Sequence, residues 1–339
     1  MKKKLKFMAN MLLVAAIAAV AASCSKDDPT SVKKQPDVYA AGYGNKGNTD
    51  IAIVWKNGVA ASLTDGINDA FANSVFVSGS DVYVAGYENK GNKYVATVWK
   101  NGAAIALTDG TNHAVAHSVF VFGNDVYAAG VEENGTQEVA KVWKNGIVTT
   151  LTDGTNQAWA SSVFVSGSDV YATGAEYNGN KYVAKLWKNG VATALTDGTN
   201  HAVAHSVYVF GNNVYVAGEK HNGNNYTATV WKNGAATALT DGTKNAVASS
   251  VFVSGSDVYV TGAEYNGSKT VAKVWKNGVA TALTDGTNHA AANSVYVFGK
   301  DVYVAGEEYK ETSYVATVWK NGALFQTLDG NSARSIFVK

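Results

Sequence analysis

Hydrophobic residues between 37 and 339 come in short runs that end at Gly, Asn, Asp or Ser. One unit contains the runs Ser74–Val77, Val82–Gly86, Tyr94–Trp99 and Ala103–Leu107, which are rich in β-branched and aromatic residues. No stretch of this unit has the 3.6-residue period of an amphipathic helix, so the pattern predicts four strands. The apolar residues scarcely alternate with polar ones, which indicates strands that are buried on both sheet faces.

This unit is repeated along the chain with a constant period. Seven tryptophans lie 44 residues apart, and each begins the tetrapeptide Trp-Lys-Asn-Gly: Trp55, Trp99, Trp143, Trp187, Trp231, Trp275 and Trp319. A period of about 40–45 residues is typical of four-stranded propeller blades. Within the motif, Asn101-Gly102 predicts a two-residue hairpin turn, because both turn positions need positive φ. We expect the repeated tryptophans to fill the space between blades rather than to bind sugars.

The two ends of the repeat array complement each other. The array begins with the second strand of a unit, at Val38–Gly42, and it ends with the first strand of a unit, at Ser335–Val338. If these strands pair, they complete one composite blade and leave no free sheet edge. The sequence therefore predicts an all-β fold, a closed seven-bladed β-propeller of four-stranded antiparallel blades over residues 37–339.

The first two strands of each unit also resemble known repeats. The segment Ala72–Val77 followed by Asp81–Gly86 resembles the bacterial SBBP and NHL-type propeller repeats, and the resemblance extends over about residues 37–339. It implies that the first strand of each unit is innermost, against the central channel. It implies no activity, because propellers host many unrelated functions.

The N-terminus has the features of an export signal. Residues 1–23 contain a basic head and an apolar run, and the ending Ala21-Ala22-Ser23-Cys24 resembles a bacterial lipobox. We therefore expect a lipoprotein signal peptide (1–23), then a lipidated Cys24 and a polar tether (24–36). The following Lys-Asp-Asp resembles the export tags of surface lipoproteins, which favours a lipid anchor in the outer membrane of a Gram-negative bacterium. The alternative is an unlipidated signal peptide with a chance cysteine.

Charge and cysteine content exclude some classes of partner. Removal of residues 1–23 takes away four of the 28 basic residues and leaves a net charge of −3, which disfavours nucleic-acid binding. Cys24 is the only cysteine, so no disulfide framework is possible. We predict no cofactor and no metal, and we expect a monomeric ring.

Most variation between units falls on one face of the predicted ring. Antiparallel order places the loops before the first strand and after the second strand on that face, whereas the repeated Lys-Asn-Gly turns lie on the other. Loops on a rigid scaffold often bind ligands, although neutral drift explains the variation equally well. The acidic pairs Glu132-Glu133 and Glu307-Glu308 fall in these loops, where we expect them to be solvated.

An aspartate in a Thr-Asp-Gly or Leu-Asp-Gly stretch recurs before the first strand. Its seven copies are Asp65, Asp109, Asp153, Asp197, Asp241, Asp285 and Asp329. Together they are candidates to bind hydroxyl-rich ligands or cations. An Asp before Gly more often accepts hydrogen bonds from its own turn, and this is the reading we favour.

A second set of candidates lies in the first strand itself. One position reads Asn73, His117, Ser161, His205, Ser249, Asn293 and Arg334, a polar ring near the predicted channel mouth. Two residues earlier, Trp159 replaces a small or apolar residue. We name His117, His205, Trp159 and Arg334 as candidate ligand-binding residues. The alternative is a polar channel lining that only holds water.

These features support three functional hypotheses. The first is a non-catalytic, envelope-anchored module that binds a glycan or a protein, with equivalent pockets between blades. The second is a propeller glycosidase or lyase acting on polysaccharide, which we disfavour because catalysis needs unlike groups and the repeats offer few. The third is a scaffold for an outer-membrane assembly.

Overall fold

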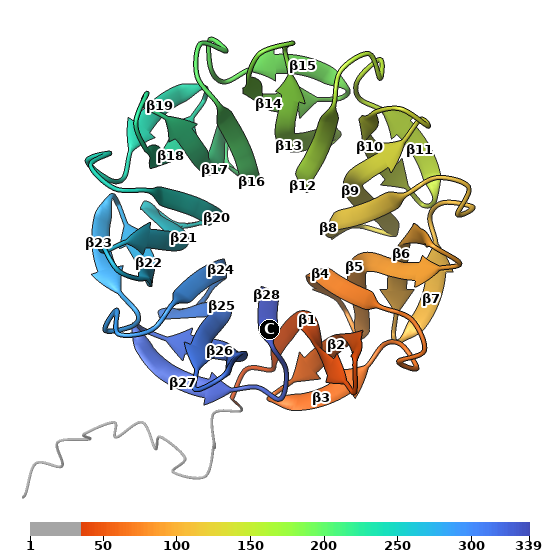
Figure 1. The fold of residues 1–339 in the computed structure, drawn as a ribbon, viewed down its shortest axis with the longest axis horizontal. Helices are drawn as coiled ribbons and strands as arrows, with labels where there is room; N and C mark the ends of the chain where they lie inside the picture. Colours follow the sequence, from red (N-terminus) through yellow and green to blue (C-terminus); the bar gives the residue numbers. More distant parts are fainter. Residues whose placement is uncertain (1–34) are drawn as a thin grey trace, which may run out of the picture. The chain divides into compact units, whose positions relative to one another are not determined.

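The computed structural model describes residues 35–339, and residues 36–339 form one compact unit. The predictions for the signal peptide, Cys24 and most of the tether lie outside the described residues. The unit consists of 28 strands in seven four-stranded sheets arranged in a ring (Figure 1). The predicted all-β, seven-bladed propeller is confirmed. Among the residues described, no helix is long and apolar enough to cross a membrane.

Each blade is an antiparallel meander, with its first strand beside the channel and its last at the rim (Figure 1). From the channel outwards, the sheets are β28 (Ser332–Val338), β1 (Val38–Lys46), β2 (Thr49–Lys56), β3 (Val59–Ser62); β4 (Ala70–Ser78), β5 (Asp81–Lys90), β6 (Lys93–Lys100), β7 (Ala103–Ala106); β8 (Ala114–Phe122), β9 (Asp125–Glu133), β10 (Glu138–Lys144), β11 (Ile147–Thr150); β12 (Ala158–Ser166), β13 (Asp169–Tyr177), β14 (Tyr182–Lys188), β15 (Val191–Ala194); β16 (Ala202–Phe210), β17 (Asn213–His221), β18 (Tyr226–Lys232), β19 (Ala235–Ala238); β20 (Ala246–Ser254), β21 (Asp257–Tyr265), β22 (Thr270–Lys276), β23 (Val279–Ala282); β24 (Ala290–Phe298), β25 (Asp301–Lys310), β26 (Ser313–Lys320), β27 (Ala323–Thr327).

The ring closes through the two ends of the repeat array, as the sequence predicts. β28 pairs antiparallel with β1, with Tyr39 opposite Phe337 and Ala40 opposite Ile336. This sheet therefore combines one strand from the C-terminus with three from the N-terminal part of the repeat array. Pairing of the ends satisfies two strand edges that would otherwise be open to another chain.

The repeated tryptophans form the core between blades. All seven indoles are at most 2% exposed. Trp143, for example, packs with Val98 and Ala85 of the preceding blade and with Ala114 and Val119 of its own blade. The inner strands of each blade are packed between neighbouring blades, so they are largely apolar on both sides, whereas the short outer strands such as β7 are exposed.

The rest of the tetrapeptide is also structural. Its asparagines have φ between 50° and 52° and its glycines between 81° and 84°, as the hairpin turn requires. Asn101 accepts a hydrogen bond from the backbone N–H of Val82 and donates one to Asp81, both at 2.8 Å. Lys100 lies 2.9 Å from Asp81 and over the ring of Tyr83. This motif therefore holds two strands of each blade together.

A β-bulge interrupts the inner strand of every blade. In β4 the register shifts between Ala72 and Ser74, so Asn73 has no partner in β5. Opposite the bulge, a Cβ on Gly86 would lie 1.9 Å from the backbone oxygen of Phe71, so only glycine fits. Bulges re-aim side chains. The bulged residues are the polar ring of the sequence: Asn73, His117, Ser161, His205, Ser249, Asn293 and Arg334.

A circle of hydrogen bonds joins neighbouring inner strands. The serine after each bulge accepts a bond from a backbone N–H of the next blade, as Ser74 does from Val119 at 3.2 Å. All seven junctions have this bond, including the one from Val75 to Ser335 across the chain ends. One edge N–H group of each inner strand is thereby satisfied within the ring.

Candidate functional site: a funnel in the central channel

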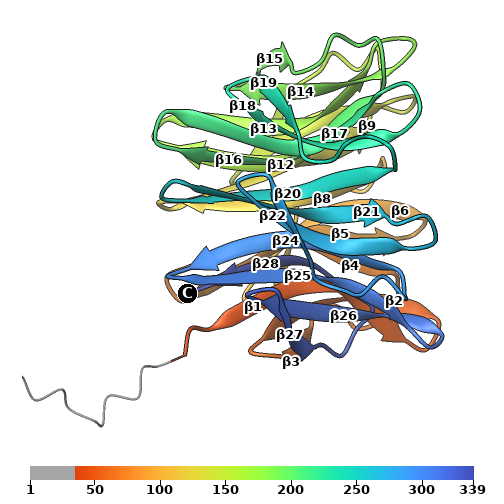
Figure 2. The same ribbon diagram turned by 90° about the vertical axis from the view of Figure 1, so that its left-hand side faces the viewer.

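The two faces of the ring carry different connections, seen edge-on in Figure 2. Turns such as Asn101-Gly102 lie on one face. The other, which we call the variable face, carries the loops between outer and inner strands (63–69 and equivalents) and the turns after the second strand (91–92 and equivalents). On this face the loop is tied to the end of the second strand, for example by the bond from Asn89 N–H of β5 to the Asp69 carbonyl at 2.8 Å.

A cavity of about 550 Å³ occupies the channel on the side of the bulges, and we call it the funnel. It is lined by Asn73, His117, Val131, Glu138, Trp159, Ser161, His205 and Arg334. The structure therefore brings together all four channel candidates of the sequence: His117, His205, Trp159 and Arg334. They come from four different blades: three of them lie at bulge positions, and Trp159 lies two residues before the bulge residue Ser161.

The direct contacts of Arg334 in the funnel wall are with neutral groups, although the carboxyl groups of Asp50 and Glu307 are close enough for its charge to act on them. Its guanidinium carbon lies 4.8 Å from the ring centre of Tyr43 and 5.1 Å from that of Phe71. Nη1 donates a hydrogen bond to Asn73 Oδ1 at 2.6 Å. Asn73 in turn donates to the Ala116 carbonyl at 2.9 Å, which keeps its amide oxygen toward the arginine. Among residues 35–339, no carboxylate lies within 4.0 Å of this cation.

The two channel histidines differ in their surroundings. Burial, and then the charge of Arg334, lower the pKa of His117 to about 4, so its ring is neutral at physiological pH. His205 Nε2 is buried without a hydrogen-bond partner. The carboxylate of Glu219 lies 3.7 Å from that nitrogen, which is beyond hydrogen-bond distance.

Trp159 and Glu138 form another part of the wall. The half-buried indole of Trp159 packs edge-on against Tyr182, with ring centres 5.0 Å apart. Glu138 accepts a hydrogen bond at 2.8 Å from Gln157, whose oxygen accepts one from Tyr182. The sequence analysis missed Glu138. It stands where Tyr94 and Tyr182 stand in other units, so a comparison of that position along the repeats would have revealed it.

The expectation that both acidic pairs are solvated in loops was wrong. The hairpins continue beyond the bulge, so Glu132 lies in β9, near Lys141 at 3.7 Å, and Glu307 lies in β25. Glu307 accepts hydrogen bonds from Asn293 at 2.5 Å and from Ser332 at 2.7 Å. Burial raises its pKa in spite of these bonds.

A collar of aromatic rings narrows the channel beyond the serine circle. Its members are Phe76, Phe120, Phe164, Tyr208, Phe252, Tyr296 and Phe337. Adjacent ring centres are 4.6 to 5.0 Å apart, and a regular heptagon with such sides is about 11 Å across. Subtracting about 1.8 Å on each side, half of a carbon–carbon contact distance, leaves at most about 7 Å between opposite rings. The funnel is thus open toward the variable face and constricted at the other end.

The repeated aspartates do not line the funnel. Asp109 accepts bonds from the backbone N–H and the hydroxyl of Thr111, at 2.9 and 2.8 Å, and these bonds lower its pKa. The equivalent turn bond is present at Asp65, Asp153, Asp197, Asp241 and Asp285. At Asp329 the backbone oxygen accepts a bond from the indole of Trp55. The side-chain contacts of the other six aspartates agree with the favoured interpretation, in which the carboxylate accepts hydrogen bonds from its own turn.

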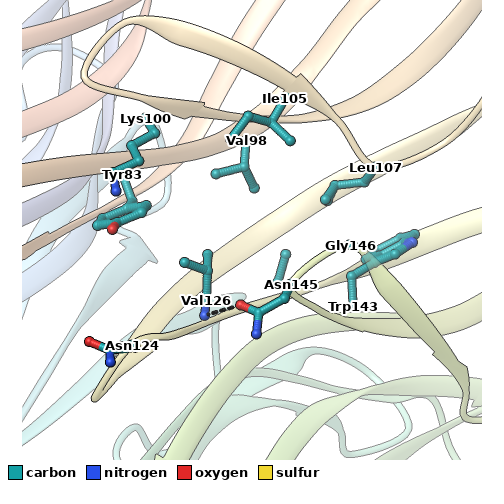
Figure 3. A pocket seen from close by; sticks show the side chains of 11 residues that line it. Tyr83, Val98, Lys100, Ile105, Leu107, Asn124, Val126, Trp143, Asn145 and Gly146 are labelled. Carbon is teal, nitrogen blue, oxygen red and sulfur yellow. Dashed lines mark hydrogen bonds between the residues drawn. The ribbon is translucent and has the colours of Figure 1, made fainter.

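The opposite face has smaller clefts between blades. Figure 3 shows one of about 250 Å³, in which Tyr83, Ile105 and Leu107 of one blade face Trp143 and Asn145 of the next. Equivalent clefts of about 240 Å³ lie at two further junctions. Their walls come from the repeated structural motif and from apolar outer strands, so they lack the individual polar residues of the funnel.

Comparison with known proteins gives no closer assignment. No protein-family model matches the chain, and no curated protein is significantly similar to it. By its strand order and ring closure, the described chain is a seven-bladed β-propeller.

Proposed function

We propose that this protein is a non-catalytic binding module, built of SBBP- or NHL-like repeats, that holds a glycan or protein ligand in the funnel. One observation carries the proposal. Arg334 and Trp159, which depart from the repeat, converge with His117 and His205 of the bulge column on one 550 Å³ cavity. Cavities of about 300–1,000 Å³ with a few convergent polar groups are typical of ligand sites.

The arrangement of acidic groups supports binding over catalysis. Glu138 is engaged by Gln157, and Glu307 is engaged by Asn293 and Ser332. A glycosidase or lyase needs an acid and a base free to exchange protons on either side of a substrate bond. Two carboxylates that already accept hydrogen bonds from fixed amides fit a positioning role better.

We further propose that Cys24 anchors the propeller to the outer membrane of a Gram-negative bacterium through a lipid. The basis is the lipobox-like sequence. Expression with a radiolabelled fatty acid should label the wild-type chain but not Cys24→Ser. Equal labelling of both would contradict the anchor and leave the binding proposal unaffected.

A glycan-array screen tests the binding proposal. The protein would be residues 24–339 with Cys24→Ser, to keep it unlipidated. We expect saccharide binding that is lost in Trp159→Val, a change that introduces the residue found at Val115 and Val203. Val203→Ala, which matches Ala291, serves as the control and should bind normally. A blank array with folded protein would favour the protein-scaffold alternative.

A further inference from the structure

We infer that the funnel binds the end of an acidic oligosaccharide, with a sugar carboxylate on Arg334 and a sugar ring on Trp159. This inference rests on the proposed function and names its ligand class. It follows from three features of the funnel, which are an incompletely paired cation, an aromatic face beside unpartnered polar groups, and a constricted floor.

Arg334 is the first feature. The guanidinium has five N–H donors, but a single hydrogen bond, to Asn73, is formed with the described residues. The cation is half-buried against Tyr43 and Phe71, where loss of water is costly for a charge that has no direct ion pair within residues 35–339. A carboxylate accepts two parallel hydrogen bonds from a guanidinium. An anionic ligand would therefore bind the guanidinium N–H groups that have no partner among the described residues.

The ligand chemistry follows from the number of cations. Among the lining residues Arg334 is the only one with a permanent positive charge, and His117 is neutral. One guanidinium suits one carboxylate, whereas phosphate-rich polymers need several cations. An acidic sugar fits this single charge.

Trp159 and the groups around it favour a sugar over an acidic peptide. Its indole is fixed by Tyr182 but lines the cavity, so an apolar ring face is presented to the ligand. Around it, His205 Nε2 has no hydrogen-bond partner, and Ser161 also lines the cavity. An aromatic face surrounded by separate polar groups matches the apolar face and the hydroxyls of a pyranose.

The aromatic collar restricts which part of a glycan can enter. It narrows the channel to at most about 7 Å, whereas the funnel on the side of the bulges has a volume of about 550 Å³. A ligand therefore fits best when it enters from the variable face. We infer that the funnel holds a chain end or a branch tip of one to three sugars.

Isothermal titration with matched oligosaccharides tests the inference on residues 24–339 carrying Cys24→Ser. The probes are trigalacturonate and its carboxyl-reduced, neutral counterpart. We expect the acidic probe to bind at least about tenfold more tightly, and added salt to reduce the difference. Arg334→Ser, which places at this bulge the residue of Ser161, should abolish the preference. Arg334→Lys should keep part of it, because charge remains while the two-bond geometry is lost.

A substitution at another bulge position, outside the funnel, is the control for effects of changing any bulge residue. Ser249→Asn changes a bulge residue that does not line the funnel into one found at Asn73 and Asn293, and it should leave affinity unchanged. Thermal melts would verify that each variant is folded.

The outcomes separate the inference from the proposed function. Equal, Trp159-dependent binding of acidic and neutral probes, unaffected by Arg334→Ser, would overturn the carboxylate assignment and leave glycan binding intact. Binding of an acidic peptide but of neither saccharide would overturn the sugar assignment and leave a protein-binding module. Absence of binding by every probe to folded protein would overturn the inference and count against the funnel as a ligand site.

Discussion

At the residue scale, the residue at each bulge position has no partner on the neighbouring strand of its own sheet. In β8, Ala116 and Ser118 pair with residues of β9 but His117 between them does not, and Arg334 is skipped in the same way where β28 pairs with β1. Such positions accept asparagine, serine, histidine or arginine with the backbone unchanged. The channel chemistry can therefore vary without loss of the fold.

His117 should make stability depend on pH. Its pKa falls from 6.5 to about 4 on folding, so between these values the unfolded chain binds more protons than the folded one. Its stabilising contribution is complete above about pH 6.5 and is lost as the pH falls toward 4. In thermal melts between pH 7 and 4.5, His117→Asn should lose less stability than the wild type.

The matched control for this measurement is Ser161→Asn, which gives the same new residue at the same kind of position without removing a titrating group. It should retain the wild-type pH dependence. A slope for His117→Asn as steep as that of the wild type would show that this ring is protonated as easily in the folded as in the unfolded chain.

At the element scale, each bulge depends on the glycine that lies opposite it on the second strand. A Cβ on Gly174 would lie 1.9 Å from the backbone oxygen of Trp159, and its neighbours at that distance are backbone atoms that cannot swing aside. Gly174→Ala should therefore destabilise the protein by about 3 kcal/mol or more, or shift Trp159 and weaken ligand binding. Chemical denaturation measures the first effect and titration the second.

The adjacent position offers the control. Thr173→Ala changes a buried residue into the one present at Ala129 and Ala217, and it should alter stability by no more than about 1 kcal/mol. If Gly174→Ala changed the stability by no more than Thr173→Ala does, the strand would be able to open locally at this glycine. The bulge would then not be what fixes the direction of the Trp159 side chain.

The repeat explains which elements could be predicted from sequence. Strand number, hairpin turns and the Trp99-type core follow from spacing and from residue types that recur in every unit. The bulge could not be inferred, because one extra residue in a short strand does not change an almost uniformly apolar pattern. For the same reason Glu307 was assigned to a loop: the length of the β25 hairpin depends on pairing beyond Gly306, which no local signal marks.

Some residues of the candidate site could likewise be recognised from the repeat, whereas others could be found only from the structure. Arg334 and Trp159 were recognisable because they depart from a column of otherwise similar residues. Their convergence with Glu138 needed the structure, since Glu138 begins β10, the third strand of a different blade. Tyr43, which supports Arg334, has no unusual neighbours in sequence and is identified only through the pairing of the chain ends.

At the scale of the whole molecule, β28 has two roles, because it closes the ring and supplies Arg334. Removal of residues 332–339 would leave β1 without its inner partner and break the serine circle at two junctions, those of Ser294 and Ser335. Each lost bond costs about 1 kcal/mol, and the exposed strand edge invites association. We expect this truncated chain to melt at a much lower temperature and to aggregate in size-exclusion chromatography.

A synthetic peptide can separate these two roles. Peptide 329–339 added to the truncated chain should restore a monomeric, cooperatively melting ring, because an added strand can complete an open sheet edge. The same peptide with Arg334→Ser should restore the ring equally well but not the preference for an acidic probe. A truncated chain that is monomeric and as stable as the full chain would show that the other six blades and three strands hold the ring without β28. Restoration of the ligand preference by the Arg334→Ser peptide would place the carboxylate elsewhere in the funnel.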